Sequence, residues 1–263
     1  MEHILTVGRI PFLVCAPFFH HFLDNFPPKI RFLDGTPSEQ NKNLREGKIM
    51  LSPSSSIEYA KNQKNYVICN RFCTSSTLEI RSVKLFSKHK WENLSDKAVF
   101  TTEQSDTSVS LLKLLSSLYF KVKPIWTDNA ESCDAKLLIG DNALRESVAG
   151  KWEYSYDLAS IWQEWQNLPF VFALWIIRKE ALGGGLRPLL ENYLNETEMS
   201  IKDFKENRKE CLQKWEKYYP HNLPQNLACD YYNAIDYSFT SQHEKSLKIF
   251  YELCGMQPEL EFI

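Results

Sequence analysis

Short apolar strands alternate with capped helices through the first two thirds of this chain, and that alternation restricts the folds open to it. Strands are expected at residues 4–10, 30–33, 48–51 and 66–69, with helices between them. Thr36 and Pro37 provide a cap and a first-turn proline for one of these helices, and Gly47 ends it. This order predicts an α/β fold with a mostly parallel sheet and helices on its faces.

Two longer β-rich runs, residues 78–87 and 170–177, bracket a second set of strands and helices. This pattern predicts two lobes joined by a double crossover, with a hinge and a central ligand cleft. We place lobe 1 at residues 1–86 plus 181–263 and lobe 2 at residues 87–180. The last third is expected to be helical, with helices at residues 200–219 and 241–254, the second of which ends at Gly255.

Composition excludes several classes of protein. The chain has 263 residues, 43% of them hydrophobic, and a formal net charge of -2. It therefore lacks the basic field that nucleic-acid or anionic-membrane partners require. The seven cysteines form no CxxC pair, and no run of about 18 apolar residues occurs. We expect a cytoplasmic protein in a reducing compartment, with no nucleic-acid or membrane partner.

A group of three hydroxyls follows the apolar strand that ends at residue 51. Ser54, Ser55 and Ser56 precede a short helix that starts near residue 57. A serine at a helix start caps free backbone N–H groups, and those groups with the helix dipole attract anions. Three hydroxyls are more than one cap needs, so a carboxylate or phosphate ligand is predicted here.

A second hydroxyl-rich junction lies in the other expected lobe. Ser105, Asp106, Thr107 and Ser108 follow a strand and open a strongly apolar helix. Taken alone, they are better explained as a structural cap. Paired with residues 54–56 across a cleft, they would suit a ligand with two carboxylates.

A third strand-to-helix junction contains Gly140 and Asp141. Gly140 would let the backbone approach a ligand closely, and Asp141 could accept a hydrogen bond from a substrate hydroxyl. The simpler reading is that Asp141 caps the following helix, and by itself that reading is favoured.

His20, His21 and Cys15 are the residues that could suggest a metal. Adjacent histidines cannot both ligate from one helix face. The sequence therefore predicts no metal and no cofactor. Cys15 is read as a buried structural thiol, because no neighbouring base is assigned to it.

Taken together, several motifs resemble one family. They are residues 8–17 (GRIPFLVCAP), 52–60 (SPSSSIEYA), 82–87 (SVKLFS), 105–109 (SDTSV), 138–144 (LIGDNAL) and 168–175 (LPFVFALW). Their order matches the MqnA family of menaquinone biosynthesis proteins, the chorismate dehydratases that open the futalosine route. The resemblance implies a two-lobed fold like that of type II periplasmic binding proteins.

The resemblance also implies a carbon–oxygen lyase that converts chorismate, a dicarboxylate, into 3-[(1-carboxyvinyl)oxy]benzoate and water. No base such as histidine occurs in the matched anion-binding motifs. We therefore expect the enolpyruvyl carboxylate of the substrate to take the proton, with Ser82 holding that carboxylate.

One position departs from the family pattern. Val14 occupies the place of the family's asparagine, and valine neither donates nor accepts a hydrogen bond. Three alternatives follow. Another group supplies that hydrogen bond, or the substrate binds in a different position, or the protein binds its ligand without catalysing a reaction. The alternatives are a non-catalytic carboxylate-binding protein of the same fold and a related enzyme of the futalosine pathway.

Overall fold

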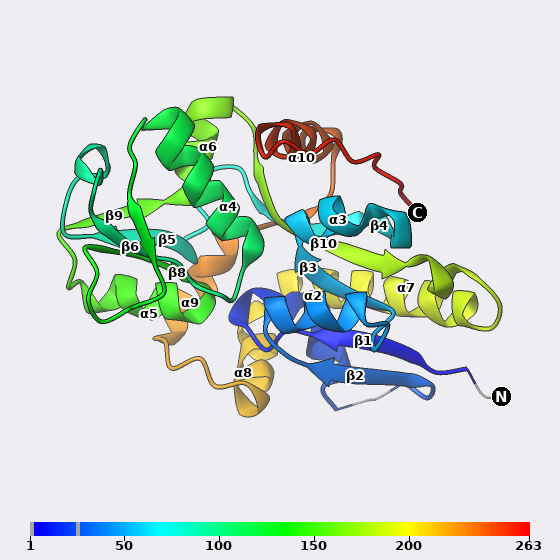
Figure 1. The fold of residues 1–263 in the computed structure, drawn as a ribbon. Coiled ribbons are helices and arrows are strands. Elements are labelled where there is room, and N and C mark those ends of the chain that lie inside the picture. The colour runs from blue at the N-terminus through cyan, green and yellow to red at the C-terminus, as the bar shows by residue number, and fades with distance from the viewer. Residues whose placement is uncertain (1–2, 25–26) are drawn as a thin grey trace.

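The computed structural model describes residues 3–24 and 27–263, which form two lobes side by side, each built around one β-sheet (Figure 1). The first sheet has the strand order β11-β4-β10-β3-β1-β2 and the second has the order β7-β6-β8-β5-β9. The strands of the first sheet are β1 Leu5–Arg9, β2 Ile30–Asp34, β3 Leu51–Ser55, β4 Tyr66–Ser76, β10 Phe170–Arg178 and β11 Asp236–Ser238. Those of the second are β5 Val83–Ser87, β6 Ala98–Phe100, β7 Ile125–Thr127, β8 Ala135–Ile139 and β9 Tyr154–Asp157.

Helices cover both sheets. They are α1 Ala16–Phe19, α2 Pro37–Arg45, α3 Ser56–Asn62, α4 Asp106–Leu114, α5 Gly140–Ala149, α6 Leu158–Gln166, α7 Leu186–Glu206, α8 Arg208–Tyr218, α9 Gln225–Tyr231 and α10 Ser241–Leu253. Figure 1 shows α4, α5 and α6 around the second sheet and α2, α3 and α7 around the first.

The predicted mostly parallel sheet is wrong, because both sheets are mixed. Strand β1 runs parallel to β2 and β3, but β10 runs antiparallel to its neighbours β3 and β4. In the second sheet β6 is parallel to β7 and β8, whereas β5 is antiparallel to β8 and β9. Strands β5 and β10 are the first strands after each change of lobe. Each runs antiparallel to both of its neighbours in the sheet that it enters.

The chain changes sheet twice. It leaves the first sheet after β4 and enters the second at β5, and it returns between β9 and β10. Since β5 belongs to the second sheet and β10 to the first, sheet membership favours lobe boundaries within residues 77–82 and 167–169. We propose these segments as the two crossovers, in place of the expected boundaries after residues 86 and 180.

Local capping signals were predicted correctly where both partners lie close together in the sequence. Helix α2 begins with a capping box, in which the Glu39 backbone N–H donates to Thr36 Oγ1 at 3.4 Å and the Thr36 N–H donates to Glu39 Oε2 at 2.7 Å. At the end of α10, Gly255 adopts a φ of 74°, as a glycine C-terminal to a helix commonly does.

Two expected elements differ from the structure. The strand expected at residues 48–51 lies at Leu51–Ser55, so Ser54 and Ser55 belong to β3, while the helix that follows begins at Ser56, near its expected start. The long C-terminal helix starts at Leu186 rather than near residue 200, and it breaks at Asn207 into α7 and α8. In the first case the strand extends because its backbone pairs with β10, a partner that local sequence does not reveal.

Aromatic side chains fill the core of the first lobe. The buried Trp175 ring on β10 packs edge-on against Phe18 and Phe72, with ring centroids 5.3 and 5.7 Å apart. Such contacts fix the segment after β1 against the sheet, and this segment lies beside the cleft described below. Among the described residues, no helix combines the length and the apolar character that crossing a membrane requires.

Acid should destabilise this fold partly through His243, in the first turn of α10. Its Nδ1 accepts from the Thr240 N–H at 3.1 Å, its Nε2 lies 2.9 Å from Ser75 Oγ, and burial lowers its pKa. In the unfolded chain the histidine pKa is about 6.5, above its pKa in the folded protein, so the unfolded chain binds the proton more readily. The free energy of unfolding therefore falls as the pH drops through about 6.5. His243→Gln should show a smaller loss than wild type between about pH 7.5 and about pH 5.5, measured by urea unfolding. His89→Gln is the control, and an unchanged loss in His243→Gln would contradict this assignment.

Candidate active site

A small cavity lies between the two lobes, and its walls come from both sheets. Of the site residues expected from sequence, those that line it are Val14, Ser54, Ser55, Ser82, Ser105, Ser108 and Gly140. Apolar side chains complete the walls, among them Phe12, Ile139 and Phe172. The cavity holds about 80 Å³, which is room for a few water molecules. This volume is small beside the about 300–1,000 Å³ that is usual for sites of drug-sized ligands.

Ser54 contributes an unpaired hydroxyl to this cavity. Its side chain on β3 is fully buried, and its Oγ has no hydrogen-bond partner among the described residues. Burying a hydroxyl without a partner costs free energy, so its persistence points to a ligand that completes the bond. The side chain of Ser55 makes no helix cap, although its backbone N–H donates to Asn41 Oδ1 at 3.3 Å.

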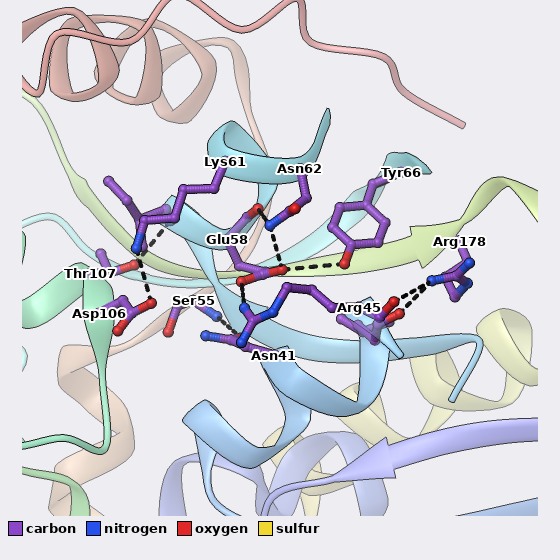
Figure 2. A network of polar contacts seen from close by, with 12 residues as sticks. Asn41, Arg45, Ser55, Glu58, Lys61, Asn62, Tyr66, Asp106, Thr107 and Arg178 are labelled. Carbon is purple, nitrogen blue, oxygen red and sulfur yellow. Dashed lines mark hydrogen bonds and ion pairs between the residues drawn. The ribbon is translucent and has the colours of Figure 1, made fainter. Parts of the chain in front are cut away.

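Ser56, Asp106 and Thr107 join the lobes directly and do not line the cavity. Thr107 Oγ1 accepts from the Ile57 N–H at 3.1 Å and lies 3.3 Å from Ser56 Oγ. Nearby, Lys61 donates to Asp106 at 3.2 Å (Figure 2). The two hydroxyl-rich junctions do face each other, as expected, but these three residues meet protein groups. The start of α3 is thus capped by a threonine from the opposite lobe.

A buried carboxylate anchors α3 behind this lobe contact. Glu58 is fully buried and pairs with the Arg45 guanidinium, while Asn62 and Tyr66 donate to it at 2.9 and 3.2 Å (Figure 2). Burial raises the pKa of Glu58, and the Arg45 charge opposes that effect. These partners fix the position of the helix that carries Ser56.

Ser105 is both a helix cap and part of the cavity wall. Its Oγ accepts from the Ser108 N–H at 3.3 Å and lies 3.0 Å from Ser108 Oγ. The capping role expected for this junction is therefore present. Both hydroxyls also border the cavity, so the second lobe presents polar groups opposite Ser54.

Gly140 closes the cavity at the start of α5, where only glycine fits well. It adopts a φ of +56°, and its N–H donates to the Ser82 carbonyl at 2.7 Å. A Cβ at this position would lie 3.0 Å from the Phe12 ring. Asp141 lies outside the cavity wall, and its Oδ1 accepts from the Leu13 N–H at 3.1 Å. Burial raises the pKa of Asp141.

Replacing Gly140 by alanine should lower the free energy of unfolding by about 1–3 kcal/mol, because the side chain meets both a left-handed backbone and the Phe12 ring. Gly150→Ala is the matched control, since Gly150 has a φ of +60° and only one atom near its added Cβ, at 4.0 Å. Urea unfolding of both variants separates backbone strain from the contact. Equal losses in the two variants would show that the Phe12 contact costs nothing.

Ser82 has a tyrosine partner that sequence reasoning missed. Tyr231, at the end of α9, donates its hydroxyl to Ser82 Oγ at 2.6 Å, and both side chains are buried. Burial raises the pKa of Tyr231 strongly, so its phenol keeps the proton it donates. With that bond in place, the Ser82 hydroxyl is free to direct its own proton into the cavity.

Two further tyrosines hold the segment that contains Val14. Tyr232 donates to the Leu13 carbonyl at 2.5 Å, and Tyr237 donates to the Val14 carbonyl at 2.7 Å. The Val14 side chain lines the cavity with carbon atoms, so it offers no hydrogen bond there. Cys15 also lines the cavity, and burial raises its pKa well above the usual value, which keeps it a thiol.

The first crossover is tied to the start of α6 by Asp157, a residue that the sequence did not single out. Its carboxylate accepts from the Ile80 and Arg81 N–H groups at 3.1 and 2.6 Å, and from the Ala159 and Ser160 N–H groups at the start of α6. One side chain thus ties the first crossover to the end of the second lobe. An aspartate directly before a helix is a recognisable cap signal, but its bond to residues 80 and 81 is not readable from sequence.

Two mixed sheets, joined by two crossovers around a cavity lined by apolar side chains and hydroxyls, define the class of periplasmic-binding-protein-like folds. Within that class, the chain belongs to the menaquinone biosynthesis family, which it matches over residues 5–256. The fold and the family expected from the sequence motifs are both confirmed.

Similar proteins agree with this assignment. A chorismate dehydratase of Thermus thermophilus is 32% identical over 184 residues, covering 61% of this chain and 65% of that protein. A chorismate dehydratase of Campylobacter jejuni is 27% identical over 219 residues, covering 76% of this chain and 85% of that protein. A periplasmic aliphatic sulphonate binding protein of Escherichia coli has the same fold, with a TM-score of 0.65 at 14% identity and coverage of 96% and 88% of the two chains.

Proposed function

We propose that this protein is a chorismate dehydratase, a hydro-lyase that forms 3-[(1-carboxyvinyl)oxy]benzoate and water. The observation that carries the proposal is the interlobe cavity of a menaquinone biosynthesis family member, lined by hydroxyls from both lobes and containing the unpaired Ser54. The similarity to two chorismate dehydratases supports the substrate. We keep the cytoplasm as the expected compartment, and a dicarboxylate as the expected ligand.

The reaction suits a site with hydroxyls and apolar walls. Chorismate loses a ring hydroxyl and a neighbouring ring proton, and the product gains aromatic stability. The protein must therefore position the ring and stabilise developing charge rather than supply a strong base. Phe12 and Phe172 provide apolar surface for the ring, and Ser54 and Ser105 provide hydroxyls for carboxylates.

Ser82 is the residue that we assign to the proton-transfer step. The carboxylate of the substrate's enolpyruvyl group takes the ring proton, and the Ser82 hydroxyl holds that carboxylate in place. Tyr231 orients Ser82 through the 2.6 Å hydrogen bond described above. Cys15 is not assigned as the base, because its buried thiol stays protonated.

One observation favours a second function, a carboxylate-binding protein without catalysis. Val14 replaces the family's asparagine and presents only carbon to the cavity. Thermal unfolding with and without chorismate, run beside a turnover assay, separates the two functions. Chorismate that raises Tm without being converted would support the binding protein, and conversion would support the enzyme. If chorismate neither raises Tm nor is converted, both proposals fail for this ligand.

A further inference from the structure

A cluster of two histidines and one aspartate lies in the first lobe and takes no part in the proposed reaction. His20 and His21 belong to a short 3-10 segment, His20–Phe22, and Asp203 belongs to α7. One ligand atom from each residue lies within 4.8 Å of the others. His21 Nε2 is 3.1 Å from Asp203 Oδ2, and His20 Nδ1 is 3.9 Å from the same oxygen.

Each of the three side chains has an outer partner that directs a lone pair inward. His20 Nε2 lies 2.7 Å from the Ser200 carbonyl oxygen, an acceptor, so Nε2 carries the proton and Nδ1 is left free. His21 Nδ1 lies 2.8 Å from Glu196 Oε1. Asp203 Oδ1 accepts from Asn207 Nδ2 at 2.7 Å, which leaves Oδ2 for the histidines. A carbonyl, carboxylate or amide behind each ligand is the arrangement found at protein metal sites.

The surrounding charges and the exposure also suit a cation. Glu196 and Asp203 each bring a carboxylate, and the Lys214 ammonium nearby is paired with Asp24 at 2.9 Å. The side chains of His21 and Asp203 are 25% and 39% exposed, so an ion can reach the cluster from solvent. Cys211 donates its thiol to Asp203 Oδ2 at 3.7 Å and completes the surroundings.

We propose that His20, His21 and Asp203 bind one Zn²⁺ ion, which fastens residues 20–22 to α7. Imidazole and carboxylate ligands suit zinc, and three protein ligands leave a fourth position for water. Ligand atoms around tetrahedral zinc lie about 3.4 Å apart, given bonds of about 2.0–2.1 Å, so His20 moves slightly inward when the ion binds. The sequence predicted no metal because the adjacent histidines were expected on one helix. The structure places them in a 3-10 segment, and α7 supplies the third ligand from far along the chain.

The same contacts describe an ion pair of a protonated His21 with two carboxylates, which needs no metal. The metal site predicts that the protein binds zinc stoichiometrically, whereas the ion pair alone predicts that it does not. Untagged, full-length protein is treated with a chelator, transferred to chelator-free buffer and titrated calorimetrically with ZnCl₂. We expect one Zn²⁺ per chain at micromolar affinity, and a rise in Tm with zinc, because the ion joins two elements of the native lobe.

Three variants and one control locate the site. His21→Gln and Asp203→Asn should each bind Zn²⁺ at least about 10-fold more weakly, and Glu196→Ala should lose about 10–100-fold through its outer contact. His89→Gln should bind like wild type, since His89 forms a separate pair with Asp134 at 3.4 Å. Because Asp203→Asn leaves both histidines in place, it keeps the test informative if His21→Gln fails to fold. No zinc binding by wild type, or equal binding by Asp203→Asn, would overturn the proposal. Neither result would affect the proposed dehydratase.

Discussion

Replacing Ser82 by alanine is expected to lower kcat for chorismate by about 100-fold while changing KM little, as loss of one positioned hydrogen-bond donor does in other enzymes. The physical reason is that the Ser82 hydroxyl holds the proton-accepting carboxylate in its reactive position, a contact that matters most in the transition state. Steady-state kinetics on purified protein measure both constants.

The matched control for this prediction is Ser87→Ala. Ser87 ends β5, the strand that begins directly after Ser82, and it is also buried, but its hydroxyl accepts from the His89 N–H and does not line the cavity. Tyr231→Phe keeps the ring and removes the bond that orients Ser82, so it should lower kcat less than Ser82→Ala does. If Ser82→Ala turns over chorismate like Ser87→Ala, Ser82 has no role in the reaction.

Replacing Ser54 by alanine should have opposite effects on stability and on ligand binding. The Ser54 hydroxyl is buried and unpaired among the described residues, so its removal should raise the free energy of unfolding by about 1 kcal/mol. The same hydroxyl is expected to donate to a substrate carboxylate, and its loss should weaken chorismate binding by about 10-fold. Urea unfolding and chorismate titration measure the two effects separately.

Ser52→Ala provides the control for Ser54, since Ser52 lies on the same buried strand. Its hydroxyl already donates to the Pro53 carbonyl at 3.0 Å, and it does not line the cavity. We expect this variant to lose some stability and to bind chorismate normally. A Ser54→Ala protein that binds as tightly as wild type would show that the unpaired hydroxyl does not contact the ligand.

Features set by neighbours in sequence were predictable from the chain alone. The Thr36 cap pairs with a residue three positions away, and the left-handed Gly255 follows directly from its place after α10. Ser54, Ser82 and Gly140, which belong to the family motifs, line the interlobe cavity. In each case a local rule or a contiguous motif contained the required information.

Contacts between distant segments were not predictable in the same way. Tyr231 meets Ser82 across 149 positions, and Thr107 caps the start of α3 across 50. The antiparallel entry of β10 likewise depends on its pairing with β3 and β4. No periodicity or cap signal identifies such partners, because these contacts form only when both sheets have folded and the two lobes lie against each other.

The central claim is that the interlobe cavity converts chorismate. The most direct measurement is incubation of purified protein with chorismate, with product identified by mass spectrometry and by the absorbance of the aromatic ring. We predict 3-[(1-carboxyvinyl)oxy]benzoate, lighter than chorismate by one water, at a rate above that of heat-denatured protein and far above that of Ser82→Ala. Intact chorismate at the end of the incubation, at a level equal to the denatured control, would contradict the assignment.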